Sequence, residues 1–298
     1  MKSKLVVEIA EGLGNQLFMY AYAFSLSKQI NYELYIDRIS GYSKKKNTLR
    51  KHQKYILDFF NINQAYANPQ DAYDDSFKRL KKKFELFLDK FYVKKKFIIE
   101  KYIKIDGKKI ALNTKTPDKK FLSKNLYIQG HFEDHNYFKH LRSDIIKMYK
   151  PLSKHLKNNS DIIQKLKNCN SVSIHIRQNR FTDQNIRKLN EINKQRSLYF
   201  TKDLIDYIKK SIIYFESNID NPEFFIWSND FSNLQDHFNE SKFNYIKGNN
   251  LINDFNLFSY AKHFIVGAST FHWWGAWLNE NPNKICLCPN NLNPSGNN

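Results

Sequence analysis

The sequence predicts an α/β protein whose parallel strands are covered by helices on both faces of the sheet. In the second half of the chain, short apolar runs alternate with longer segments of helical periodicity. Near the start, Glu11–Phe18 has the pattern of a strand that turns into a helix, and residues 263–278 repeat that pattern. The 298 residues suffice for one large or two medium domains, and an apolar content of 41% supports a packed core rather than disorder.

The first half of the chain predicts a strand, a helix and further strands, followed by a basic segment. The spacing of Leu80, Phe84, Phe87, Leu88, Phe91 and Tyr92 is helical, so we expect a basic helical insertion at about 78–109. Pro151 ends the last helix of this half. The expected strands lie at 4–10, 33–37 and 125–132, and the expected helices at 16–30 and 137–149.

The second half alternates strand and helix after a linker expected within residues 150–170. A polar loop at 178–195 follows the first strand, and the Asn-rich tail at 290–298 is expected to fray. The expected strands lie at 171–177, 223–228, 243–247, 263–266 and 284–288, and the expected helices at 197–215, 232–238, 251–261 and 271–279.

The charge is strongly positive, with 48 Lys and Arg against 29 Asp and Glu. Such an excess of positive charge favours binding to nucleic acids, anionic membranes or acidic small molecules. Residues 78–109 hold thirteen basic residues and four acidic ones, so roughly half of the net charge lies there. Because no recognised nucleic-acid-binding motif accompanies it, nucleic acid is not expected as a partner. Two interpretations of the segment stay open: it docks on anionic lipid, or it is a solvated helix face.

Cysteine usage and the N-terminus indicate a cytoplasmic protein. Cys169, Cys286 and Cys288 form no disulfide framework, and no second Cys/His pair near the last two suggests zinc. Glu8 and Glu11 interrupt the first apolar run, which argues against a signal peptide. The longest apolar stretch is too short to span a bilayer. We expect a soluble, cytoplasmic protein with a peripheral inner-membrane location as a further possibility.

The first candidate site is the turn after the first strand. Gly12 and Gly14 permit a tight turn and a close approach of a ligand to the backbone. Asn15 either caps the helix or binds a substrate, and an ordinary capped turn is equally compatible with the spacing. A glutamate at a strand-to-turn position, such as Glu8 or Glu11, is expected at the surface.

The second candidate site follows the strand at 171–177. His175 and Arg177 lie two residues apart, on one face of the strand, at the carboxyl end where such folds bind ligands. An arginine there can hold a phosphate by a two-pronged contact. The alternative is a histidine satisfied in the core beside a surface arginine.

Two later strand ends and one helix start also carry polar residues. Asn229 and Asp230 either contact a base or ribose, or cap the next helix, and Asp254 is more simply explained as a helix cap. Ser269 and Thr270 open a helix, where hydroxyls and backbone N–H groups can meet phosphate oxygens. Phe271 could cover a sugar or base, whereas the tryptophans that follow are expected in the core.

These stretches, in this order, resemble the α-1,2-fucosyltransferases of glycosyltransferase family 11. The resemblance runs from about Lys4 to Pro289. The matching segments are 12–21 (GLGNQLFMYA), 174–177 (IHIR), 227–231 (WSNDF) and 269–278 (STFHWWGAWL), with 129–133 (QGHFE) as a less specific element.

The resemblance implies a GT-B fold, in which two Rossmann-like domains face each other across a cleft. It implies an N-terminal acceptor-binding domain at 1–155 and a C-terminal GDP-fucose-binding domain at 156–298. The implied reaction is inverting transfer of fucose to a hydroxyl, O2 of a terminal galactose on a bacterial surface glycan, without metal or other cofactor. The alternatives are another linkage, another nucleotide sugar, or a glycan- or nucleic-acid-binding protein without catalysis.

By its matching positions, the resemblance also implies roles for individual residues. Arg177 would hold the GDP diphosphate, and Asn15 would lie at the reacting centre. The implied donor-binding residues are Gly14, His175, Arg177, Asn229, Asp254, Ser269, Thr270 and Phe271, and the implied acceptor-binding residues are Glu11, Asn15 and Gln16.

The chain departs from the family pattern directly after Arg177. Where the pattern continues Arg-Gly-Asp, this sequence has Gln178, Asn179 and Arg180. Either Arg180 supplies the missing positive charge from a shifted place, or donor binding is altered.

Overall fold

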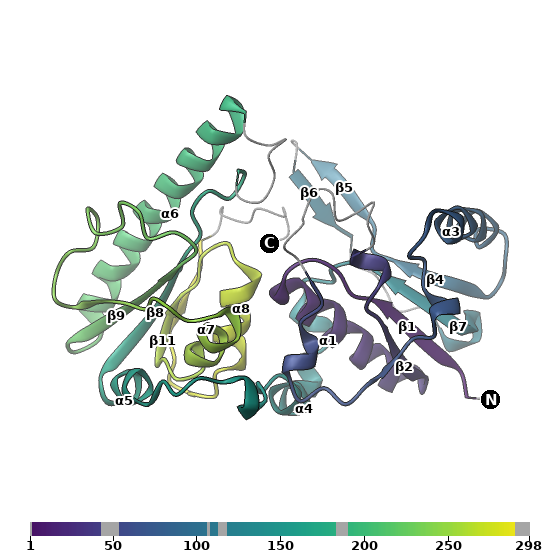
Figure 1. Cartoon of the computed structure of the whole chain (residues 1–298), viewed down its shortest axis with the longest axis horizontal. Coiled ribbons are helices and arrows are strands. Elements are labelled where there is room, and N and C mark those ends of the chain that lie inside the picture. The colour runs from purple at the N-terminus through teal and green to yellow at the C-terminus, as the bar shows by residue number, and fades with distance from the viewer. Residues whose placement is uncertain (1, 43–53, 106–107, 113–117, 183–189, 290–298) are drawn as a thin grey trace. The chain divides into compact units, whose positions relative to one another are not determined.

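The computed structural model describes residues 2–42, 54–105, 108–112, 118–182 and 190–289 (Figure 1). The chain forms two compact units, residues 1–150 and 151–294. The sequence-based boundary lay a few residues later, after residue 155, and the functional role of each unit stays a prediction.

The first unit is built on a five-stranded sheet of order β3-β2-β1-β7-β4. All neighbouring strands in it are parallel. A two-stranded antiparallel hairpin, β5 and β6, stands apart from this sheet. The elements are β1 (Lys4–Glu8), α1 (Leu13–Ile30), β2 (Glu33–Asp37), β3 (Ala65–Tyr66), α3 (Ser76–Leu88), β4 (Lys95–Ile99), β5 (Tyr102–Ile105), β6 (Lys108–Ala111), β7 (Leu122–Gln129) and α4 (Arg142–Met148).

Helix α1 forms much of the core of this unit. Its own apolar and small residues lie on nearly every side of the helix, and most of them are buried. The rings of Tyr22 on α1 and Phe132 after β7 stack with centroids 3.8 Å apart. The helix begins at Leu13, three residues earlier than expected, because Gly12 is extended and serves as its N-cap.

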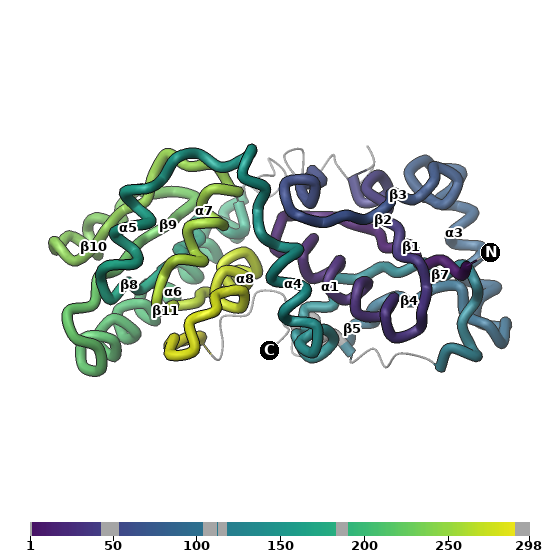
Figure 2. Tube along the Cα trace, turned by 90° about the horizontal axis from the view of Figure 1, so that it is seen from below, coloured from purple at the N-terminus to yellow at the C-terminus, as the bar shows by residue number. Residues whose placement is uncertain are grey.

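The second unit contains a five-stranded parallel sheet of order β10-β9-β8-β11-β12 (Figure 2). Its elements are α5 (Ser160–Asn168), β8 (Asn170–Ile176), α6 (Glu191–Asn218), β9 (Pro222–Ser228), β10 (Phe243–Tyr245), α7 (Leu251–Phe258), β11 (His263–Ile265), α8 (Thr270–Leu278) and β12 (Cys286–Leu287).

Two apolar clusters show that helices cover both faces of this second sheet, as predicted. On one face, Ile174 packs with Leu204 and Ile208 of α6. On the other face, Phe264 packs with Phe258 of α7 and with Ala276 of α8.

Close packing between α7 and α8 depends on Gly275. A Cβ added there would lie 2.7 Å from the Cβ atom of Phe258, so a larger residue would force the two helices apart.

Several expected elements are wrong in detail. Residues 232–238 form turns instead of a helix. The expected linker at 150–170 includes α5, whose Leu166 is buried in the core of the second unit. The basic segment is helical only as far as Leu88, and then supplies the edge strand β4 and the hairpin. The tail at 290–298 lies outside the described residues.

Among the described residues, no helix is long and apolar enough to cross a membrane.

Candidate active site

The carboxyl edge of the second sheet gathers most of the predicted donor-binding residues. Strand β8 lies between β9 and β11, and all three run in parallel. Arg177 follows β8, Asn229 follows β9, and the turn at 266–269 follows β11. The chain continues from β8 through α6 to β9 on one side, and later reaches β11 on the other side of β8 through α7. This edge is therefore a switch point of the kind at which α/β folds bind ligands.

His175 is a buried, neutral histidine next to this edge. Burial, together with the positive charge of Arg177, lowers the pKa of His175 to about 3. Its ring packs against Phe271, with centroids 5.7 Å apart, and its Nδ1 atom bonds to no described residue. An uncharged imidazole with a buried, unsatisfied nitrogen is unusual in a core and suits contact with a polar ligand.

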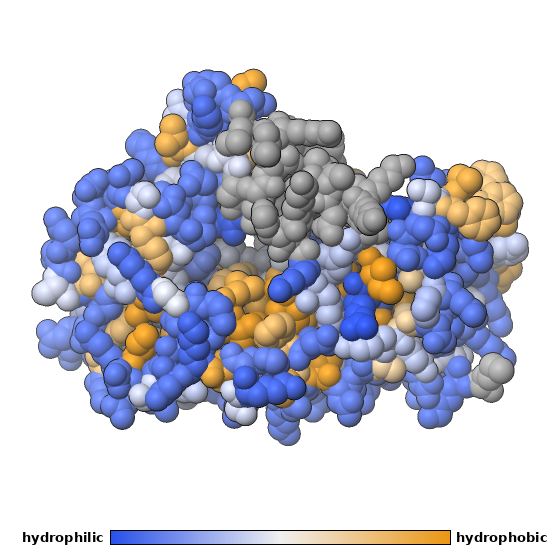
Figure 3. Space-filling view, in the orientation of Figure 1, coloured by the Kyte–Doolittle hydropathy of each residue, from blue (hydrophilic) through white to orange (hydrophobic). Residues whose placement is uncertain are grey.

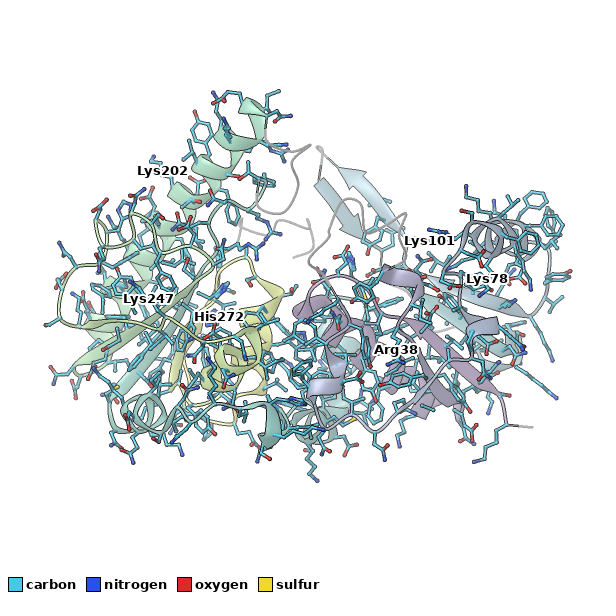
Figure 4. All side chains as sticks on the ribbon, in the orientation of Figure 1. Arg38, Lys78, Lys101, Lys202, Lys247 and His272 are labelled. Carbon is cyan, nitrogen blue, oxygen red and sulfur yellow. The ribbon has the colours of Figure 1, made fainter. Side chains whose placement is uncertain are left out.

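A second buried histidine, His272, lies on α8 (Figure 4). Its Nε2 atom lies 2.8 Å from the hydroxyl of Ser173 on β8, and its ring centroid lies 5.9 Å from that of His175. Burial holds the pKa of His272 well below its ordinary value, and His175 adds to that effect. This contact fixes α8 against the sheet, and the sequence analysis did not identify it.

The start of α8 carries backbone N–H groups and the hydroxyl groups of Ser269 and Thr270. Ser269 is the extended N-cap residue, and its side chain does not cap the helix. Thr270 is the first helical residue, and the N–H groups of the first turn point toward the N-terminal end of the helix. Phe271 packs against Phe258 and Phe255, which makes it partly a core residue. Such an arrangement favours an anionic ligand at the helix start.

Asp254 on α7 is a half-buried residue whose Oδ1 atom is buried, and it is not a helix cap. The side chain of Asn250 caps α7 by accepting hydrogen bonds from the Ile252 and Asn253 N–H groups. Burial raises the pKa of Asp254 to about 6, while Asn249 and Trp227 nearby partly offset the rise. The Asp254 Oδ1 atom makes no hydrogen bond to any described residue. The expected capping role is therefore wrong, and a poorly satisfied buried carboxyl group is typical of functional sites.

Asn229 and Asp230 do not cap a helix either, because turns follow them. The Asn229 side chain accepts a hydrogen bond from the Gln178 N–H at 2.8 Å and donates one to the Gln178 carbonyl at 3.1 Å. The Gln178 amide donates to the carbonyls of Asp230 and Ser232, and the Asn179 amide donates to the Asp230 carboxylate. The residues that depart from the family pattern thus tie the loops after β8 and β9 together.

Arg180 reaches the turn before α8. Its guanidinium donates to the Ala268 carbonyl at 3.4 Å and lies 5.6 Å from the ring centroid of Phe200. This places a second arginine beside the helix start, three residues after Arg177.

At the carboxyl edge of the first sheet, Glu11 adopts a left-handed backbone conformation, with φ of +65°. This is costly for a residue with a side chain, and neighbours hold it in place. The Glu11 carbonyl accepts hydrogen bonds from the Gln16 side chain at 2.8 Å and from the Tyr42 hydroxyl at 3.0 Å.

Gln16 is fully buried, and both ends of its amide are engaged. Besides the bond to Glu11, it donates to the Lys54 carbonyl and accepts from the Ile56 N–H. Gln16 therefore holds the backbone of the turn at Glu11 against residues 54 and 56. Gly14, one of the predicted donor-binding residues, is buried in the first turn of α1 in this same unit.

The Glu11 carboxylate meets Asn15 and His131. The Asn15 amide donates to Oε2 of Glu11 at 2.6 Å, and Nε2 of His131 lies 3.3 Å from the same oxygen. On its other side, Nδ1 of His131 lies 3.5 Å from the Tyr102 hydroxyl and 4.0 Å from the Glu133 carboxylate. The segment 129–133 was recognised as a motif, and Glu11 was predicted as an acceptor-binding residue, but His131, Tyr102 and Glu133 were not predicted as site residues.

The carboxylates around His131 control its protonation. Burial lowers the pKa of His131, but the hydrogen bond and charge of Glu11, with the charges of Glu133 and Glu100, outweigh it and raise the pKa above its ordinary value. Glu100 is itself buried and accepts hydrogen bonds from the His131 and Phe132 N–H groups. The site thus holds a histidine of raised pKa within ion-pair distance of the Glu11 carboxylate.

The expected surface position of Glu8 is wrong. It is buried and accepts hydrogen bonds from Lys82 at 3.1 Å and from Tyr127 at 3.0 Å. The Tyr127 hydroxyl also lies 2.7 Å from Oδ2 of Asp37, so the ends of β1, β2 and β7 are joined by one buried polar network.

Within the part of the chain that the structure describes, no group of three or more His, Cys, Asp or Glu side chains is placed to hold a metal ion.

Sequence comparisons show the family. The family model described as glycosyl transferase family 11 matches residues 4–296. An α-1,2-colitosyltransferase of Escherichia coli is 30% identical, with 96% of this chain and 91% of that protein aligned. The O-antigen biosynthesis glycosyltransferase WbnK of Escherichia coli is 25% identical, with 94% and 92% aligned.

Solved structures confirm the fold. Arabidopsis thaliana FUT1 in complex with GDP matches with a TM-score of 0.54 and 11% identity, covering 98% of this chain and 71% of that one. The α-1,6-fucosyltransferase NodZ of Bradyrhizobium, crystallised with GDP, matches with a TM-score of 0.51 and 11% identity, covering 94% and 93%. The fold is therefore α/β of the GT-B type, as predicted. The chain belongs to glycosyltransferase family 11.

Proposed function

We propose that the protein transfers fucose from GDP-fucose to a hydroxyl of a glycan, O2 of a terminal galactose, with inversion at the anomeric carbon. The observation that carries this proposal is the edge of the second sheet, where His175 and Arg177 at the end of β8 neighbour the start of α8, which follows the adjacent strand β11. His175 and Asp254 of α7 each have a buried polar atom without a hydrogen bond. Family membership and the GDP complexes of proteins with the same fold support a GDP-sugar donor at that edge.

In this proposal, the second unit handles the diphosphate. As the bond between the anomeric carbon and the phosphate oxygen breaks, GDP leaves with the electron pair and negative charge grows on its β-phosphate. Arg177 and the N–H groups at the start of α8 stabilise that charge. Arg180 adds a second guanidinium from three residues further along, which compensates for the arginine that the family pattern has and this chain lacks.

His175 and Asp254 serve the nucleotide and the sugar in different ways. Neutral His175 offers a hydrogen-bonding nitrogen without adding charge beside Arg177. Asp254 offers a carboxyl oxygen to a hydroxyl or base N–H of the donor, which would lower its pKa toward the ordinary value on binding. Ser269, Thr270 and Phe271 border the same helix start. Asn229 acts on the donor indirectly, by holding the backbone next to Arg177.

The first unit, in this proposal, handles the acceptor. The acceptor hydroxyl oxygen forms a bond to the anomeric carbon and gives its proton to the Glu11 carboxylate, and the proton then passes to solvent. Asn15 and His131 orient that carboxylate, and His131 shares the proton through its contact with Oε2. Positioned acid–base groups of this kind typically contribute about 10²- to 10⁴-fold in rate.

A second candidate donor is a nucleotide-linked colitose, which one relative suggests. The relative of 30% identity is an α-1,2-colitosyltransferase. Colitose is fucose without its 3-hydroxyl, so a site that bonds that hydroxyl would strongly prefer fucose, and one that does not would accept both sugars. The two relatives also support a bacterial surface polysaccharide as the acceptor, since one is an O-antigen biosynthesis enzyme.

The test is release of GDP from GDP-fucose with and without lactose, beside GDP-colitose, GDP-mannose and UDP-galactose. Release from GDP-fucose that lactose stimulates, with the linkage read by NMR of the product, is the expected result. GDP release that lactose stimulates from GDP-colitose alone would make colitose, and not fucose, the transferred sugar. No release from any donor, with or without a panel of galactosides, would leave the glycan-binding alternative.

A further inference from the structure

Helix α3 of the first unit is turned around relative to an ordinary surface helix, because its charged side faces the protein. Lys82 is buried, bonds to Glu8, and lies 4.2 Å from the ring centroid of Tyr127. Glu85 accepts a hydrogen bond from Tyr73 at 2.7 Å and pairs with Lys96 at 2.9 Å. These polar contacts attach the helix to the sheet, together with Leu86, which packs against the apolar cluster of Val6, Phe97 and Tyr127.

The apolar side of α3 faces outward. The exposed fractions of Phe77, Leu80, Phe84 and Phe87 are 78, 66, 63 and 55%. The turn after the helix continues the surface with Phe91, Tyr92 and Val93, which are also exposed. Figure 3 shows hydrophobic side chains gathered over α3. We call these seven residues the α3 apolar surface.

Such a surface indicates a binding partner. A surface helix ordinarily buries its apolar stripe in the core, and single exposed apolar residues are common. A contiguous row of four apolar residues on successive turns of one helix, with three more beside it, instead marks an interaction site. Because the polar side of α3 already holds the helix in place, the outward stripe is not needed for folding.

The charges around this surface are those that an anionic bilayer attracts. At 100° per residue, Lys81 and Lys83 flank the row on its two sides, and both are exposed. Lys90 and Lys94 are exposed in the turn that follows. Asp75, at the N-cap of α3, is the exposed acid at the other end. A second copy of the chain is a poorer partner, because the lysines of two such surfaces would face each other.

We propose that α3 and the turn after it lie flat on an anionic lipid bilayer, with the phenylalanines at the boundary between headgroups and acyl chains and the lysines among the headgroups. An amphipathic helix with aromatic residues on one side and lysines at its borders binds in this way. The helix of 13 residues extends about 20 Å along the surface. This surface places the enzyme where lipid-linked glycans are accessible, and it does not depend on the donor proposed above.

The test is co-sedimentation of the full chain with vesicles of phosphatidylcholine alone, or with one quarter phosphatidylglycerol. We expect binding to the anionic vesicles that weakens in high salt. The double variant Phe84→Ser/Phe87→Ser should bind at least about tenfold less, and Lys81→Glu/Lys83→Glu should lose the preference for anionic lipid. Matched controls on α6, Leu198→Ser/Tyr199→Ser and Lys209→Glu/Lys210→Glu, alter equally exposed residues and should bind as the wild type does.

Three results would overturn the proposal. One is wild-type protein that does not bind anionic vesicles, and another is binding that the α3 variants and the α6 controls reduce equally. The third is a concentration-dependent dimer, seen by sedimentation velocity, that Phe84→Ser/Phe87→Ser abolishes, since this would assign the surface to a second copy. Thermal unfolding of each variant shows whether it is folded, and exposed positions should tolerate these changes.

Discussion

The carboxyl edges of the two sheets have the same architecture and opposite chemistry. At the edge of the second sheet, Arg177 and Arg180 lie near histidines whose pKa values are lowered, so the fixed charge there is positive. At the edge of the first sheet, Glu11, Glu100 and Glu133 surround His131 and raise its pKa. The contrast teaches that one kind of strand-and-helix scaffold can supply either stabilisation of an anionic leaving group or acceptance of a proton, depending on which residues end its strands.

The largest expected effect comes from removing the cation at the second edge. Arg177→Ala should lower the rate of transfer from GDP-fucose by about 10²- to 10³-fold, because charge on the leaving phosphate loses a fixed donor. Arg177→Lys should recover only part of the rate, since a lysine cannot make the two-pronged contact. Steady-state kinetics at saturating acceptor measure both values. Transfer by Arg177→Ala at near the wild-type rate would refute the assignment.

At the first edge, Glu11→Gln should lower kcat for transfer by about 10²-fold while leaving the affinity for GDP within about twofold. The glutamine keeps the shape of the side chain but cannot accept the proton. Asn15→Asp serves as a contrast, because it places a second carboxylate against Glu11 and should raise the pH at which transfer reaches its maximum. Single-turnover transfer across pH 5–9 is the measurement, and an unchanged kcat in Glu11→Gln would remove Glu11 from the proton transfer.

Arg180→Ala should have a smaller effect, raising KM for the donor by about tenfold with a modest change in kcat. Arg180 reaches the helix start through a longer contact than a strong hydrogen bond, so it adds to a site that Arg177 already defines. The informative companion is Gln178→Arg, which restores the family residue in the Arg180→Ala background. Recovery of donor affinity in that double variant would show that the two arginines substitute for each other, and no effect of Arg180→Ala would show that Arg180 is not involved.

The smallest expected effect concerns stability at the second edge. The pKa of Asp254 is raised to about 6 in the folded protein, so its ionisation disfavours folding above that pH. Its contribution to stability is fully present below the ordinary pKa of aspartate and is lost as the pH rises through about 6. Asp254→Asn, which resembles the protonated acid, should therefore raise the free energy of unfolding at pH 7.5 by about 1 to 3 kcal/mol, and the gain should vanish toward pH 4.

Denaturant unfolding at the two pH values measures this difference, and weaker donor binding should accompany the added stability. Equal stability of the wild type and Asp254→Asn at both pH values would show that the carboxyl group is not destabilised by burial. Asp206, an exposed aspartate on α6, offers the matched control Asp206→Asn.

The sequence predicts the second edge better than the first. Apolar runs locate β8, β9 and β11, and because parallel strands end at one edge, His175, Arg177 and Ser269 can be placed together from spacing alone. The pairing of His131 with Glu11 could not be predicted in this way. It joins residues 120 positions apart and depends on a left-handed turn at Glu11, for which the sequence carries no glycine signal.

Helix α3 shows a second limit of sequence interpretation. The spacing of Leu80, Phe84 and Phe87 predicts a helix correctly, but periodicity cannot tell which side of a helix faces the protein. The side is decided by the buried pair of Lys82 and Glu8, which comes from distant parts of the chain. Edge strand β4 was missed for a related reason, since its lysines resemble a continuation of the basic helix.

The measurement that tests the central contrast most directly is titration calorimetry of GDP into the wild type, Arg177→Ala and Glu11→Gln under one set of conditions. The account predicts that Arg177→Ala binds GDP at least about tenfold more weakly, whereas Glu11→Gln, folded and inactive in transfer, binds it as the wild type does. Wild-type affinity in Arg177→Ala, or an equal loss in Glu11→Gln, would contradict the division of roles between the two edges.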